Sequence, residues 1–168
     1  ILYRSSDSLE RLPKGSSGQA LVMGASNAPE WGAASGSGYE SMQVFLTPAD
    51  TNAQTNHTWT KPANITRIKV FCTGAGGGGG YYWGGGGGSG GTAIKDIDVT
   101  SISSVSVTLG AGGQLVSSNP ATDGGTSSFG SHCSATGGEG GGPHGHSNDA
   151  FPGEGGIGSG GDLNLPGG

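Results

Sequence analysis

Apolar and polar residues alternate most clearly in ITRIKVFCT, residues 65–73. The alternation places Ile68, Val70 and Cys72 together on one face of an extended chain. A period of two residues predicts a β-strand with one buried face. The same pattern recurs in TAIKDIDVT, residues 92–100, and it begins VSVTLGAGG.

The rest of the chain adds short strand candidates and no helical pattern. Residues 42–46 are one candidate, and TSSFGSHCSAT predicts one or two strands around Phe129 and Cys133. No window of ten or more residues repeats its apolar positions with a helical period. We therefore expect an all-β fold in which antiparallel strands over about residues 42–136 form a sandwich-like domain. Its expected core residues are Trp59, Ile68, Val70, Cys72, Val105, Val107, Leu109 and Phe129.

Residues 1–34 differ, because a few large apolar residues stand between turn-forming residues. Pro13 and several glycines interrupt any helical stripe, so we expect short extended pieces. One chain cannot bury these apolar residues by itself, but copies from several chains could bury them around a common axis. We expect a joint at SGSGYES, residues 35–41, followed by a glycine-rich β domain over residues 42–168 with a glycine-rich C-terminal loop region from residue 137. The structural residues expected in the first segment are Leu9, Leu12, Leu21 and Trp31.

Glycine supplies 39 of the 168 residues, and it gathers in runs such as GAGGGGGYYWGGGGGSGG, residues 74–91. The runs lack the three-residue period of collagen. A dinucleotide-binding loop is also excluded, because no helix can follow Gly74, Gly76 and Gly79 to receive a pyrophosphate. A disordered linker and an ordered, polyglycine II-like arrangement remain. The strands that flank each long run favour ordered loops, since they provide an anchor.

Charge and chemistry exclude several functions. The net charge is −5 and the seven basic residues are scattered, so we expect no nucleic-acid binding. No apolar run approaches the length of a membrane span, so we expect no membrane insertion. Cys72 and Cys133 lack the spacing of a metal motif and are expected to be buried free thiols, with a disulfide as the alternative. Asp96 and Asp98 would face solvent on an alternating strand, and no catalytic constellation is recognisable, so we expect neither an enzyme nor a cofactor.

Two parts of the chain resemble bacteriophage tail fibres. LERLPKGSSGQALVMGASNAPEW, residues 9–31, resembles a short element that recurs in these fibres. The ordered series TWTKPANITRIKVFCTGAGGGGG, VSVTLGAGG and GGTSSFGSHCSATGGEGGG resembles their distal glycine-rich domain. The resemblance implies a homotrimeric virion fibre, with residues 1–34 as a trimeric collar or shaft segment. It also implies non-catalytic attachment to a host surface, outside the cell, with other tail or fibre proteins as partners.

The host receptor implied by this resemblance would be a bacterial surface glycan or an outer-membrane protein. A purely structural fibre or joint segment, with recognition elsewhere in the virion, is the alternative. The chain begins at Ile1 and ends at Gly168, and we interpret it as a segment of a longer polypeptide.

Two clusters are candidate receptor-binding sites. Tyr81, Tyr82 and Trp83 could stack on sugar rings, or they could pack against the sheet or a sister chain. PHGHSNDAF, residues 143–151, could be a recognition loop or a solvated turn. Its candidate residues are His144, His146, Asn148, Asp149 and Phe151. The two histidines have the H-x-H form that binds iron in some trimeric phage fibres, but a single copy makes this a weak signal, and we expect no metal.

Overall fold

The computed structural model divides the chain into two compact units, Ile1–Gln43 and Val44–Gly168. The structure describes residues 2–4, 8–17, 19–24, 28–33, 41–47, 52–82, 84–117, 121–142 and 151–168.

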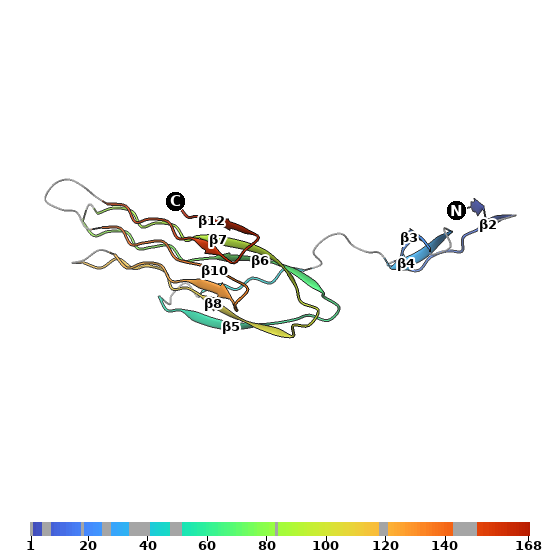
Figure 1. The fold of residues 1–168 in the computed structure, drawn as a ribbon, viewed down its shortest axis with the longest axis horizontal. Helices are drawn as coiled ribbons and strands as arrows, with labels where there is room; N and C mark the ends of the chain where they lie inside the picture. Colours follow the sequence, from blue (N-terminus) through green and yellow to red (C-terminus); the bar gives the residue numbers. More distant parts are fainter. Residues whose placement is uncertain are drawn as a thin grey trace. The chain divides into compact units, whose positions relative to one another are not determined.

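Two antiparallel sheets form the base of the second unit (Figure 1). The larger sheet has the order β11-β10-β9-β8-β5 and the smaller one the order β12-β7-β6. No helix occurs in the part of the chain that the structure describes, and the all-β, sandwich-like prediction is confirmed. The strands are β5 (Thr55–Thr60), β6 (Arg67–Thr73), β7 (Thr92–Asp98), β8 (Ser104–Leu109), β9 (Ser127–Phe129), β10 (Cys133–Ala135), β11 (Gly158–Ser159) and β12 (Leu163–Leu165).

The core lies between these two sheets. On β6 the predicted alternation holds, since Cys72 is buried while Lys69 and Phe71 are exposed. Trp59 and Phe129 meet edge to face at its centre, with ring centroids 5.7 Å apart. The buried cluster contains Trp59, Cys72, Ala93, Ile97, Val99, Val105, Val107, Phe129, Cys133 and Ala135, with Ile68, Val70 and Leu109 packed against it.

The strand expected at residues 42–46 is not present. Residues 41–47 have no regular secondary structure. Phe45 packs against the core, and its ring centroid lies 5.7 Å from that of His57. One apolar anchor therefore holds this segment in place of a strand ladder.

Two strands lie beyond the region expected to contain them. β11 pairs with β10 through Ser134 and Ser159, and β12 pairs with β7 through Leu163 and Ile94. Both are edge strands, which need only backbone partners on one side. They have only two and three residues, so the alternation of Leu163 and Leu165 is too short to predict a strand.

Six glycine-rich runs extend from the sheets as a bundle of side-by-side traces (Figure 1). They are run 1 (residues 74–80), run 2 (84–91), run 3 (110–116), run 4 (121–126), run 5 (136–142) and run 6 (151–157). We call this bundle the glycine lattice.

Backbone hydrogen bonds join the runs with a period of three residues. Every third N–H of run 1 donates to run 2, and every third N–H of run 2 donates to run 5. Intervening residues bond to other neighbours, so each run has partners on several sides, as in polyglycine II. A β-strand, with its period of two, would bond on two sides only. The donor–acceptor pairs of the first two ladders are Gly74–Gly91, Gly77–Gly88 and Gly80–Gly85, then Gly85–Gly142, Gly88–Glu139 and Gly91–Thr136.

Close backbone approach explains the glycine content of the lattice. A Cβ on Gly77 would lie well inside 3.0 Å of the carbonyl oxygen of Glu139, and one on Gly88 would lie equally close to the Glu154 carbonyl. At Gly79 and Gly86 a Cβ would meet nothing within 4 Å. Only some of the glycines are therefore required by packing within one chain.

Among its described residues, the first unit contains two hairpins. They are β1 (Leu2–Arg4) with β2 (Leu9–Arg11), and β3 (Gln19–Met23) with β4 (Pro29–Ala33). Trp31 Nε1 donates to the Pro13 carbonyl at 2.6 Å, and its indole covers Gly15. Leu9 and Leu21, expected as structural core residues, are exposed in the single chain.

Candidate functional site

Three chain reversals lie at the end of the glycine lattice remote from the sheets. Each is closed by a backbone hydrogen bond between two successive runs, within two residues of the run ends. The bonds run from Gly80 N to Gly85 O at 2.8 Å, from Thr122 N to Gln114 O at 3.0 Å and from Gly142 N to Phe151 O at 2.8 Å.

The hydrogen bonds of Gly78 show that the three reversals lie at the same height along the glycine lattice. Its N–H donates to the Thr122 carbonyl at 3.0 Å, and its carbonyl accepts from Gly141 N at 2.8 Å. Both partners are within one residue of a closing bond. The reversals therefore lie at one end of the lattice, although their sequences are tens of residues apart.

Large apolar side chains are exposed at this end. Those among the described residues are Tyr81, Tyr82, Leu115 and Phe151, which we call the lattice tip. The Tyr81 and Tyr82 ring centroids lie 5.7 Å apart. The structure thus brings Phe151 to the same end as the two tyrosines.

Tyr82 has a left-handed backbone conformation, with φ of 51°. Such a φ is unusual for a bulky aromatic residue, and strained residues gather at functional sites. The conformation turns the chain between run 1 and run 2 and leaves the Tyr82 side chain exposed. Sequence reasoning had no signal for this conformation.

Other predicted site residues are not placed. Trp83, His144, His146, Asn148 and Asp149 lie outside the described residues. Leu115, in contrast, was not predicted as a site residue. The sequence feature that could have indicated it is an apolar Leu-Val pair, residues 115–116, at the end of a glycine-rich run.

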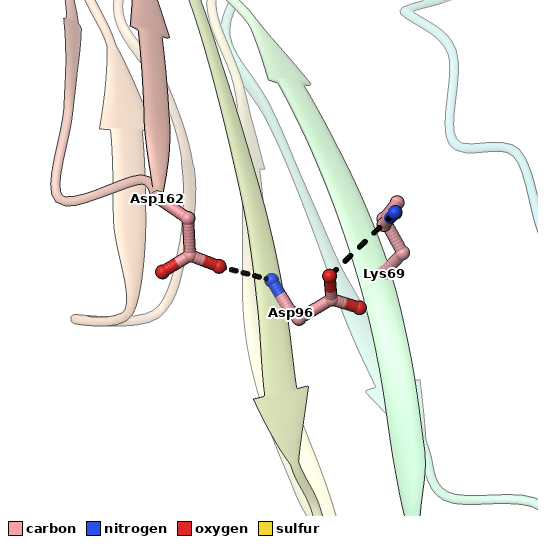
Figure 2. Close-up of polar contacts among 3 residues, drawn as sticks. All are labelled: Lys69, Asp96 and Asp162. Atoms are coloured by element: carbon pink, nitrogen blue, oxygen red, sulfur yellow. Dashed lines mark hydrogen bonds and ion pairs between the residues drawn. The ribbon is translucent and has the colours of Figure 1, made fainter.

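Asp96 and Asp98 lie on β7 of the smaller sheet, and Figure 2 shows the polar contacts of Asp96 with Lys69 and Asp162. Asp96 lies 3.6 Å from Lys69 Nζ, and its N–H donates to Asp162 Oδ2 at 2.8 Å. Asp98 accepts hydrogen bonds from Thr100, which lower the pKa of that carboxyl. Asp96 and Asp98 are both exposed, as the alternation predicts, and their contacts join neighbouring strands or cap a turn.

Cys72 and Cys133 meet in the core as free, buried thiols. The two neighbouring thiols influence each other, which raises the pKa of Cys72 and lowers the pKa of Cys133 to about 7. Burial opposes ionisation of both thiols, and the positive charge of Lys95 further favours a thiolate at Cys133. Cys72 lies one residue before the end of β6, and Cys133 begins the three-residue strand β10, which run 5 follows.

Clustered metal-ligating side chains and long apolar helices are both absent from the described residues. No group of three or more metal-ligating side chains gathers among them. Within the same residues, no helix has the length and apolar character of a membrane span.

Comparison with known families gives one match. The model of a glycine-rich domain family matches residues 50–168, which is most of the chain. The chain belongs to this family. The match includes both sheets and the whole glycine lattice, and therefore most of the second unit. Searches of curated proteins and of solved structures gave no significant match.

Proposed function

We propose that the chain is a virion tail-fibre protein that attaches a bacteriophage to its host without catalysis. The lattice tip would contact the host, and the first unit would join three chains into a fibre. The partners would then be sister chains, other tail or fibre proteins and a host receptor, and the protein would act outside the cell. The resemblance of residues 9–31 to tail fibres supports the assignment to a virion.

One observation carries the binding role, namely exposed aromatic residues at the end of a hydrogen-bonded scaffold. Tyr81, Tyr82 and Phe151 come from two reversals that the lattice holds level. Aromatic faces stack on sugar rings, and a tyrosine hydroxyl adds a hydrogen bond at a low entropic cost. A bacterial surface glycan or an outer-membrane protein is therefore the proposed receptor, and three chains would strengthen weak sites through avidity.

The hairpins of the first unit support assembly with sister chains. Leu21 and Met23 share one face of the β3–β4 hairpin, because they are two residues apart on β3, and both are exposed. An isolated two-stranded hairpin is marginally stable in water. Equivalent hairpins of two further chains would cover these side chains and supply a shared core.

Changing Tyr81, Tyr82 and Trp83 together to alanine should lower adsorption to host cells at least tenfold, roughly the loss from removing one aromatic hot spot. The measurement is binding of labelled chain to intact bacteria, with isolated lipopolysaccharide and outer-membrane vesicles as separate probes. Binding to lipopolysaccharide indicates a glycan receptor, and binding to vesicles alone indicates a protein.

Phe71→Ala is the matched control for this experiment. Phe71 is 67% exposed and Tyr82 is 72% exposed, but Phe71 lies on the smaller sheet instead of the tip. Adsorption should be unchanged in Phe71→Ala. Full adsorption by the triple variant, with its fold intact, would favour a structural fibre segment whose receptor site is elsewhere in the virion.

The full chain should sediment at three times the mass of one chain, and Leu21→Asp should sediment as a monomer. A charge on the shared face of the hairpins would be buried without a partner in the trimer. Leu163→Asp is the matched control, because Leu163 is 50% exposed and Leu21 is 46% exposed. A monomeric wild-type chain, or equal dissociation of both variants, would contradict assembly through the first unit.

A further inference from the structure

The two cysteines of the core lie on strands from different sheets. Cys72 is on β6 of the smaller sheet, and Cys133 is on β10 of the larger one. Their exposed fractions are 7% and 4%, both belong to the same buried cluster, and their two strands contact one another. The two thiols therefore lie together inside a packed core.

The pair also stands at the base of the glycine lattice. Run 1 begins two residues after Cys72, and run 5 begins three residues after Cys133. The two runs hydrogen-bond to one another through Gly138 N to Ala75 O at 3.0 Å and Gly141 N to Gly78 O at 2.8 Å. A covalent link between the cysteines would fix the relative position of these runs directly below their shared ladder.

We propose that Cys72 and Cys133 are the site of a reversible intramolecular disulfide that joins the two sheets beneath the glycine lattice. This inference does not depend on the proposed function. In a reducing compartment the pair stays as dithiol, and under oxidising conditions it closes. The same chain would then have a looser and a cross-linked form of its lattice base.

The reaction needs an oxidant, and a low-molecular-weight disulfide such as oxidised glutathione supplies it. The Cys133 thiolate attacks one glutathione sulfur and releases one glutathione thiolate, which leaves a mixed disulfide. Cys72 loses its proton to that thiolate and attacks the Cys133 sulfur, releasing the second glutathione. Two electrons pass from the protein thiols to glutathione, and the new bond joins Cys72 and Cys133.

The lower pKa of Cys133 assigns it the first attack, because the thiolate is the nucleophile. Since both thiols are buried, the oxidant reaches them through local opening of the short strand β10. Local opening controls the rate of disulfide formation, whereas the equilibrium between dithiol and disulfide depends on the geometry of the folded pair. The equilibrium is therefore the quantity to measure.

The test is a redox titration of the full wild-type chain in glutathione buffers of graded ratio, with acid quenching, alkylation and mass analysis. The disulfide fraction gives the effective concentration of the thiol pair, in the folded chain and again in guanidinium chloride. The link closes a loop of about sixty residues, so we expect the folded value to exceed the unfolded one on the order of a thousandfold. A ratio above about tenfold supports the proposal.

A ratio at or below that level, or a glutathione mixed disulfide as the main folded product, would overturn it. The matched control moves one thiol to the other face of β10, in the double variant C133S with S134C. Its folded chain should show an effective concentration near that of the unfolded chain. If this variant fails to fold, the wild-type comparison still decides the question.

Discussion

Replacing Gly77 by alanine should lower the free energy of unfolding by about 3 kcal/mol, whereas replacing Gly79 should leave it unchanged or raise it by up to about 1 kcal/mol. Both residues lie in run 1, two positions apart. The Cβ introduced by Gly77→Ala would overlap the Glu139 carbonyl, which accepts the hydrogen bond from Gly88 N. Backbone held on several sides cannot move away as a side chain can.

Gly79 has open space where the Cβ would stand. Alanine there loses less backbone entropy on folding than glycine, and this accounts for the small gain. Urea unfolding followed by tryptophan fluorescence measures both changes. Gly88→Ala and Gly86→Ala repeat the comparison in run 2, since only the Gly88→Ala Cβ would meet a carbonyl. Equal effects within either pair would contradict the hydrogen-bonded packing of the runs.

Replacing Phe129 by alanine should lower the free energy of unfolding by about 4 kcal/mol. Phe129 is buried and meets Trp59 edge to face, so truncation leaves a cavity between the two sheets. Trp59 remains as a fluorescent reporter of unfolding. Ser106→Ala, on the exposed face of β8, is the control and should change the free energy by less than about 0.5 kcal/mol.

Phe129→Ala also tests whether the two sheets anchor the glycine lattice. If both parts unfold together, amide exchange of Gly88, which donates to Glu139, should report the same loss of stability as the amides of β5. Loss of protection in β5 alone would show that the lattice is stable without its base. The glycine runs lose much backbone entropy on folding, so we expect a common loss.

The strands of the core could be predicted from sequence because alternation is a local signal. Ile68, Val70 and Cys72 identify the inner face of β6 without knowledge of any other strand. β11 and β12 could not be predicted in this way, because edge strands depend on the backbones beside them. The strand predicted at residues 42–46 was wrong for the opposite reason. Its local pattern suggests a strand, but residues 41–47 form no strand ladder.

The candidate site was predicted in part. Tyr81, Tyr82 and Phe151 stood out as aromatics within glycine, and the structure describes all three as exposed. Their common position at one end of the lattice depends on the register of runs that are distant in sequence. Leu115 lies at the same end only because of that register, which no local sequence pattern predicts.

By itself, the sequence determined the all-β class and the inner faces of the main strands, because both depend on residues close together in the chain. It favoured ordered glycine runs through the strands that flank them. The tertiary structure decided which glycines are required, since Gly77 and Gly79 belong to the same unbroken glycine stretch. Only the position of a neighbouring carbonyl distinguishes them. The same packing between distant segments placed Cys72 beside Cys133 and the three reversals at one end, because contacts across a fold depend on register and not on residue type.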